Sequence, residues 1–192
     1  MKYLIRKIVK KLIDKDFLGV FFINTININV KFEKFSGRIF QMIGTRKIFI
    51  SHSKHSFPLT GKNYVNLIDW LCEKVYYSKY LPKSGDVILD IGTGYGHEIV
   101  WLNERSSNVN FICIEPNPEV FCYLRLNTSH IKKINLINCF VGNKESVTFS
   151  INLDYASSDS INSSDFGWEI DGIRLNNIIE KYDRIDLLKL NI

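Results

Sequence analysis

A carboxylate followed by alternating glycines is the strongest chemical signal in this sequence. Asp90 closes the short apolar run 87–89, and glycine then occupies every second position of the segment 92–96. Glycine lets the backbone turn sharply and lets a ligand lie against main-chain N–H groups without meeting a Cβ atom. A helix expected over residues 97–104 would direct its positive N-terminal end at that ligand. The pattern therefore predicts a cradle for a nucleotide-like ligand at the end of a buried strand.

The glycine spacing and a second carboxylate indicate which nucleotide this is. A dinucleotide fingerprint has the form G-x-G-x-x-G, but His97 stands at its sixth position, whereas acid-x-Gly-x-Gly-x-Gly is typical of class I S-adenosylmethionine-dependent methyltransferases. Glu115 ends the next apolar run, where an acid that binds ribose hydroxyls belongs. Because adenosylmethionine and NAD both carry a ribose, the glycine spacing, and not Glu115, favours adenosylmethionine. The alternative is an ordinary strand-to-helix turn beside a solvent-facing Glu115.

Three segments resemble the FkbM-type methyltransferases. They are Leu81–Gly92, Ile114–Pro118 and Ile185–Asn191, which are similar to the family's Pro-Gly-Asp lead-in, its Glu-Pro-Asn-Pro and its Leu-Lys-Ile-Asp-x-Glu-Gly. The resemblance covers about residues 81–192. Two positions depart from the family pattern: Gly94 stands where Asn is usual, and Asn191 stands where Asp is usual. The second departure removes a carboxylate from the active-site end of a strand.

The resemblance implies an adenosylmethionine-dependent O-methyltransferase that acts on a hydroxyl of a sugar, a glycan or a secondary metabolite. Such an enzyme aligns the acceptor oxygen, the methyl group and the sulfur. Asp90 would approach the methionyl amine and Glu115 the ribose, while Asn191 would lie on the acceptor side, where an amide cannot act as a general base. No catalytic base is identified. The expected cofactor-binding residues are Asp90, Gly92, Thr93, Gly94, Tyr95, Gly96, Glu115, Pro116, Asn117 and, along the adenine, Cys139, Phe140 and Val141.

Two other functions stay open. The chain could be a catalytically inert fragment or accessory module that binds adenosylmethionine or nothing, which the amide at Asn191 favours. A nucleic-acid methyltransferase is suggested by the basic front end, but the Asp/Asn-Pro-Pro-aromatic motif of amino-methyltransferases is missing from the sequence. We therefore expect no nucleic-acid partner, and a turnover assay with product detection separates the enzyme from the inert module.

The composition is that of an ordinary globular domain. The chain has 192 residues, of which 45% are hydrophobic and 23% charged, enough for one domain with a proper core. Its four cysteines (72, 113, 122 and 139) lack C-x-x-C spacing and sit in apolar runs, so we expect reduced core residues in the cytoplasm and neither disulfides nor zinc. His52 and His55 form a lone H-x-x-H without a carboxylate partner nearby, and we predict no metal site there.

The positive charge is concentrated at the front of the chain. Residues 1–56 carry a balance of +9, against +5 for the whole chain. Within them, residues 1–15 place apolar side chains at helical spacing among lysines and an arginine. We expect an amphipathic helix that packs on the domain; the alternative is a helix that lies on an anionic membrane surface. No apolar run approaches the length needed to span a bilayer.

The predicted elements divide the chain at residue 80. Residues 1–80 would hold the first helix, a small β-meander (strands 26–32, 38–43 and 47–51) and a linking helix over 63–80. Residues 81–192 would alternate strands and helices, which predicts an α/β fold with a doubly wound, mostly parallel Rossmann-like methyltransferase sheet. The elements expected there are strand 87–91, helix 96–104, strand 110–115, helix 117–127, strand 134–140, strand 147–151, helix 175–182 and strand 185–192.

Two further segments carry expectations of their own. The serine-rich stretch 154–165 is either a solvated connector or a segment that faces substrate. The sequence stops within the last predicted strand, so the sheet would hold about four core strands and be incomplete. We expect the natural protein to be longer and the open sheet edge to favour self-association.

Overall fold

The structure is a computed structural model that describes residues 30–33, 36–43, 46–51, 64–150 and 167–191. The expected first helix, His52, His55 and the serine-rich stretch lie outside the described residues. The chain divides into two compact units, Met1–Leu67 and Ile68–Ile192, which are described separately.

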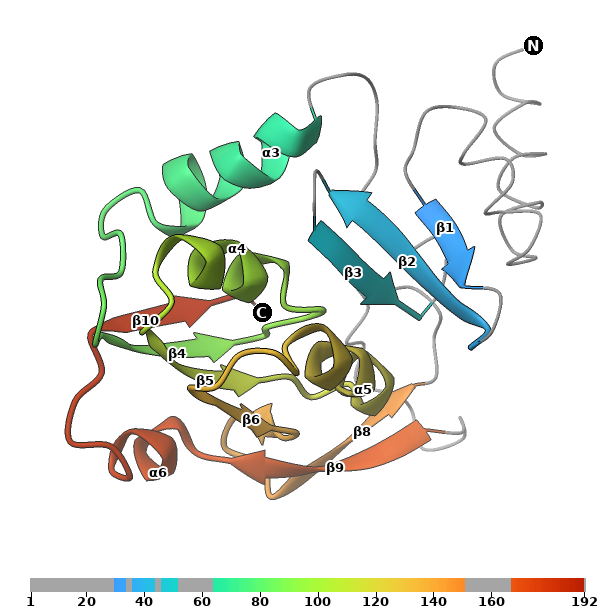
Figure 1. The fold of residues 1–192 in the computed structure, drawn as a ribbon. Coiled ribbons are helices and arrows are strands. Elements are labelled where there is room, and N and C mark those ends of the chain that lie inside the picture. Colours follow the sequence, from blue (N-terminus) through green and yellow to red (C-terminus); the bar gives the residue numbers. More distant parts are fainter. Residues whose placement is uncertain (1–29, 34–35, 44–45, 52–63, 151–166, 192) are drawn as a thin grey trace, which may run out of the picture. The chain divides into compact units, whose positions relative to one another are not determined.

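The first unit contains the predicted β-meander. Its strands are β1 (Val30–Glu33), β2 (Arg38–Ile43) and β3 (Arg46–Ile50), antiparallel and in that order (Figure 1). The Lys47 ammonium lies 2.8 Å from the Glu33 carboxylate. The same ammonium lies over the rings of Phe40 and Phe49.

The linking helix is shorter than predicted and changes its winding. It consists of α3 (Tyr64–Leu71) followed by a π-helical turn, η2 (Cys72–Tyr76), and it ends before residue 80. Asp69 accepts a hydrogen bond from the Trp101 indole at 2.6 Å and pairs with Arg105 at 3.0 Å. These bonds tie the segment to the rest of the second compact unit, which begins at residue 68.

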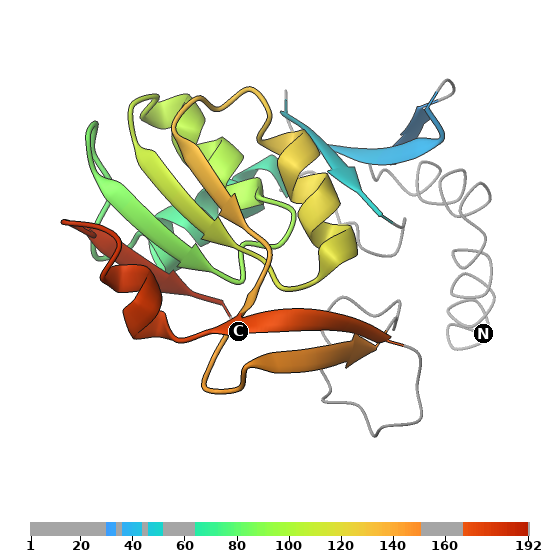
Figure 2. The same cartoon turned by 90° about the horizontal axis from the view of Figure 1, so that it is seen from below.

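The second unit is built on a four-stranded parallel sheet, which confirms the predicted α/β fold. Its strands are β4 (Val87–Ile91), β5 (Asn110–Ile114), β6 (Ile134–Ile137) and β10 (Leu187–Leu190), in the order β10-β4-β5-β6. The helices α4 (His97–Arg105) and α5 (Pro118–Asn127) cover one face, and α6 (Leu175–Ile179) covers the other (Figures 1 and 2). Ile178 of α6 packs with Leu89, Ile91, Ile112 and Ile114 in the core of the second face.

A second sheet interrupts the predicted course after β6. The strand expected over 134–140 ends at Ile137, and β7 (Phe140–Val141) pairs in parallel with β9 (Gly167–Ile173). β9 was not predicted from the sequence, and it also pairs antiparallel with β8 (Ser146–Ser150). The chain leaves the central sheet at Asn138, whose side chain donates to the main-chain oxygens of Glu115 and Pro116 at 2.7 and 3.0 Å.

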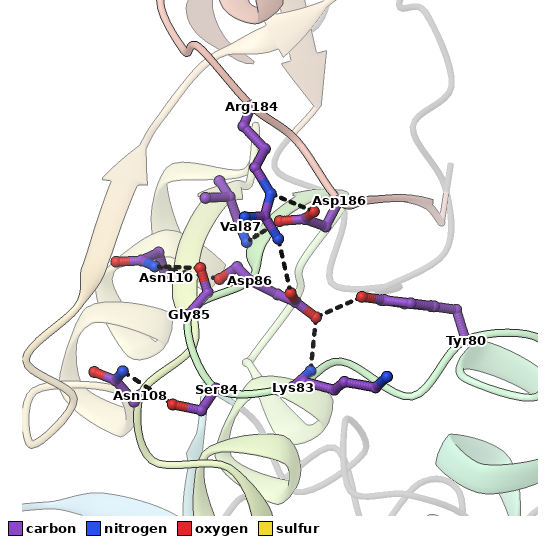
Figure 3. A network of polar contacts seen from close by, with 10 residues as sticks. All are labelled: Tyr80, Lys83, Ser84, Gly85, Asp86, Val87, Asn108, Asn110, Arg184 and Asp186. Atoms are coloured by element: carbon purple, nitrogen blue, oxygen red, sulfur yellow. Dashed lines mark hydrogen bonds and ion pairs between the residues drawn. The ribbon is translucent and has the colours of Figure 1, made fainter.

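The amino ends of β4 and β10 are joined by a polar network (Figure 3). The Asp86 carboxylate accepts hydrogen bonds from the Tyr80 hydroxyl at 2.7 Å, the Lys83 N–H at 2.7 Å and the Arg184 guanidinium at 3.2 Å. The Val87 N–H donates to Asp186 at 2.9 Å. The pKa of Asp86 is lowered, chiefly by the hydrogen bond from the Lys83 N–H and then by the one from the Tyr80 hydroxyl. The network anchors β10 beside β4 at the end opposite to the glycine segment.

The four cysteines, all within the described residues, form no disulfide, and three of them are buried as predicted. Cys122 is exposed on α5, so its assignment to the core was wrong: its apolar neighbours in sequence lie on a helix, where only one face is buried. Within the described ranges, no group of three potential metal ligands gathers. None of the described helices is both long and apolar enough to cross a membrane.

Candidate functional site

The glycine segment forms a tight turn at the carboxyl end of β4. Gly92, Gly94 and Gly96 all have positive φ, at 78°, 63° and 82°. The N–H groups of Gly92 and Thr93 both donate to the Ile114 carbonyl, at 2.9 and 3.0 Å. The turn is therefore held against the end of β5, and its backbone angles favour glycine at each of the three positions.

At two of the glycines, a Cβ atom would meet neighbouring protein atoms. A Cβ atom on Gly92 would lie 2.1 Å from the Asn191 carbonyl oxygen. A Cβ atom on Gly96 would lie 2.8 Å from Cδ1 of Leu124 in α5. A side chain at Gly92 would have to displace the backbone at the end of β10, whereas one at Gly96 would have to move the Leu124 side chain. The role of Gly92 and Gly96 against a cofactor stays a prediction.

Glu115 holds the turn from the neighbouring strand. One carboxylate oxygen accepts the Gly94 N–H at 2.9 Å, and the other accepts the Asn117 N–H at 2.9 Å. Glu115 is only 7% exposed, so it is not the solvent-facing side chain of the alternative interpretation. Burial raises the pKa of Glu115, and the two backbone hydrogen bonds oppose this shift. Since a carboxylate offers about four acceptor positions, each oxygen keeps capacity for one more donor.

Asp90 forms a buried ion pair that the sequence analysis missed. Its Oδ1 lies 2.9 Å from the Lys189 ammonium on β10, and Asp90 and Lys189 are 0% and 6% exposed. Oδ2 of Asp90 forms no hydrogen bond among the described residues. Burial raises the pKa of Asp90 to about 6, although Lys189 opposes the shift. Burial lowers the pKa of Lys189, but Asp90 and Glu98 outweigh it and raise the pKa overall.

Asn117 begins α5 as its sequence context predicts. Its side chain accepts the N–H groups of Glu119 and Val120 at 3.0 and 3.2 Å, and Pro118 follows in the first turn. Asn117 therefore offers a ligand chiefly its backbone, because its side-chain oxygen is used in capping. Pro116, beside it, is half-buried.

The segment expected along an adenine lies at the start of the second sheet. Cys139 is 2% exposed and packs in the core cluster that contains Ile178 of α6, so its side chain faces the protein interior. Phe140 and Val141 are half-buried in β7. Val141 packs against the same cluster, and if an adenine binds here the Cys139 side chain cannot contact it without rearrangement. The adenine contact itself stays a prediction.

Of the remaining predicted residues, Tyr95 lies within the turn and Asn191 lies beside it. Tyr95 is 1% exposed, and its carbonyl accepts a hydrogen bond from Asn127 at 2.9 Å. His97, beside it, is buried, and burial lowers its pKa. Asn191 is exposed at the end of β10, where its N–H donates to the Ile91 carbonyl at 2.9 Å.

The structure thus brings most of the predicted residues to the carboxyl edge of one sheet. Asp90, the glycine turn, Glu115 and Asn191 meet there, whereas the Cys139 side chain points into the core. Two further residues contact these groups and were not among the expected cofactor-binding residues, Lys189 and Asn138. Lys189 could have been suspected as a lone cation in an apolar strand, which is rare unless it is paired. Asn138 lies near the carboxyl end of the strand predicted over 134–140, where ligands of such sheets bind.

No family model matches the chain, and no curated protein matches its sequence. It is similar to a precorrin-6y C5,15-methyltransferase from Geobacter metallireducens (18% identity over 44% of this chain and 44% of that one, TM-score 0.34). It is also similar to a transferase from Pyrococcus horikoshii (14% identity over 65% of this chain and 47% of that one, TM-score 0.40). A third similar structure is an RNA methyltransferase from the same organism (20% identity over 50% of this chain and 47% of that one, TM-score 0.34). The matched region spans less than half the length of each structure. These similarities concern the fold, and membership of the FkbM-type family stays a prediction.

Proposed function

We propose that the carboxyl edge of β4 and β5 binds S-adenosylmethionine. The observation that carries the proposal is the Glu115 carboxylate, fixed by two backbone N–H groups beside a turn of positive-φ glycines. Each oxygen of Glu115 retains capacity for one donor, which fits the two hydroxyls of a ribose. A nicotinamide dinucleotide would present the same diol, but the glycine spacing favours adenosylmethionine.

A buried atom of the site also fits the methionyl part of this cofactor. Oδ2 of Asp90 is an acceptor without a hydrogen bond among the described residues, and such an atom is costly unless a donor reaches it. The methionyl amine is a cationic donor, which suits a carboxylate. Because Asp90 is 0% exposed, this contact requires the turn 92–96 to open or a water molecule to bridge it.

The reaction that we propose is methyl transfer to a hydroxyl of a sugar, a glycan or a secondary metabolite. The bound cofactor would supply an electrophilic methyl group, and the protein would align the acceptor oxygen with it. Asn191 is exposed beside the glycine turn, where its amide can orient an acceptor hydroxyl by a hydrogen bond. An amide cannot take up the proton at neutral pH, so Asn191 positions the acceptor and does not act as the base.

Isothermal titration calorimetry with S-adenosylhomocysteine tests the cofactor site. Glu115→Gln should weaken binding about tenfold or more, because a hydrogen bond to a charged group contributes about 1.5–3 kcal/mol. Glu119→Gln is the matched control, since it makes the same change at an exposed position of α5. If the wild type binds NADH but not S-adenosylhomocysteine, a dehydrogenase replaces this proposal.

A second candidate is a module that binds the cofactor without turnover. It is favoured by the close approach of the Asn191 carbonyl to Gly92, which closes the turn beside Asp90. Incubation of the chain with adenosylmethionine and a panel of sugar and phenolic hydroxyls, followed by detection of S-adenosylhomocysteine, separates the two candidates. Product above the no-acceptor control supports the enzyme, and binding without product supports the module.

A further inference from the structure

Lys189 and Asp90 are direct neighbours across two parallel strands. The register of β10 on β4 places Lys189 opposite Asp90, and the ammonium contacts only one of the two carboxylate oxygens, Oδ1, at 2.9 Å. A buried ion pair of this kind is weak evidence for a gain in stability, because desolvation of both charges opposes their attraction. The pair also leaves Oδ2 of Asp90 without a hydrogen bond among the described residues. Stability alone therefore does not explain this arrangement.

The surroundings of the pair carry an excess of negative charge. Glu98 on α4 is 7% exposed and acts electrostatically on both Asp90 and Lys189, so a second carboxylate lies within electrostatic reach of the pair. The other titratable groups that interact with Asp90 are Tyr76 and Tyr77 at the end of the linking helix, Cys113 on β5 and Glu115 after it. None of these supplies a second positive charge. A cation that reached Oδ2 would therefore be favoured.

We propose that Lys189 is a positioning residue of the cofactor site, which holds Asp90 as a carboxylate through Oδ1 and leaves Oδ2 for the cofactor's cationic methionyl amine. The inference rests on the proposed function. Without the ammonium, Asp90 would keep its burial and the neighbouring Glu98, both of which favour the neutral acid. With Lys189 in place the pKa of Asp90 is about 6, so the carboxylate prevails at pH 7. Loss of Lys189 would raise this pKa further and weaken the attraction to the amine.

Two ligands that differ in the amino-acid part distinguish this role from a structural one. S-Adenosylhomocysteine carries the amine, whereas 5′-methylthioadenosine has the same nucleoside without it. Lys189→Met should weaken S-adenosylhomocysteine about tenfold at pH 7 and leave methylthioadenosine unchanged. The ratio of variant to wild-type Kd for S-adenosylhomocysteine should fall as the pH rises from 6.5 to 8.5, because Asp90 regains its charge. Lys189→Arg, which keeps the cation, should restore most of the affinity.

A double variant guards against misfolding of Lys189→Met. In Asp90→Asn/Lys189→Met both charges are absent, so no buried charge is left unpaired at either position. It should bind methylthioadenosine like the wild type and S-adenosylhomocysteine as weakly as Asp90→Asn alone. Equal weakening of both ligands by Lys189→Met, or wild-type affinity of the double variant for S-adenosylhomocysteine, would overturn the inference. If the wild type binds neither ligand, the proposed function itself fails, and the inference fails with it.

Discussion

The contact between β10 and the glycine turn predicts different effects for two glycine-to-alanine substitutions. Gly92 has a φ of 78°, and a Cβ atom there would lie 2.1 Å from the Asn191 carbonyl oxygen. Gly85 has a φ of 92°, but a Cβ atom there would meet nothing within 4 Å. Both substitutions introduce the same kind of backbone strain, and only Gly92→Ala adds a steric clash. Gly85→Ala is therefore the matched control.

The expected magnitudes follow from these two terms. A left-handed backbone costs a non-glycine residue about 1–2 kcal/mol, and alanine recovers about 0.4–1 kcal/mol by restricting the unfolded chain. Gly85→Ala should therefore lower the free energy of unfolding by about 1 kcal/mol. At Gly92 the obstacle is backbone, held by the hydrogen bond from the Asn191 N–H to Ile91. Overpacking of this kind adds about 1–3 kcal/mol.

Urea denaturation followed by circular dichroism measures the difference. With an m value of about 1–3 kcal/mol/M, Gly92→Ala should unfold at a midpoint about 1 M lower than Gly85→Ala. Equal midpoints for the two variants would show that the Asn191 carbonyl does not press against Gly92 in solution. The account of why position 92 requires glycine would then be wrong.

Three further predictions concern charge and the sheet edge. The pKa of Asp90 is raised from 3.8 to about 6, so between these pH values the native state binds more protons than the unfolded state. The free energy of unfolding should therefore fall by about 2 kcal/mol as the pH rises from 4 to 6. Asp90→Asn should remove this slope in urea titrations, and an unchanged slope would contradict the shift. The pKa of Asp86 is lowered, so the Asp86 carboxylate stabilises the folded state at neutral pH, and this contribution is lost as the pH falls through the native-state pKa, below 3.8. Asp86→Asn should therefore lower Tm at pH 7 more than at pH 3. An equal decrease at both pH values would refute the ionic contribution. Leu188 and Leu190 are 40% and 55% exposed on β10, an edge of the central sheet. Changing both leucines to Lys should reduce the concentration-dependent self-association measured by sedimentation velocity. Ile179→Lys on α6 is the control. A wild type that sediments as a monomer at every concentration would refute this expectation.

Local chemistry determined the elements that the sequence analysis predicted well. The apolar run before Asp90 forms β4, and the alternating glycines form a turn with positive φ at each glycine. Asn117 caps α5, because an Asn before Pro satisfies free N–H groups at a helix start. These features depend on neighbours within a few residues, so the sequence alone contains the information needed to predict them.

Tertiary structure decided which of these residues meet and what each one does there. The sequence could not show that Lys189 faces Asp90, because a pairing across 99 positions depends on strand register. It could not show that Gly92 is required by the Asn191 backbone or that Cys139 faces α6. It also missed β9, whose pairing with β7 and β8 stabilises a segment of weak local preference. Local hydrogen bonding and periodicity are encoded in adjacent residues, whereas contacts between distant segments exist only once the sheet has formed.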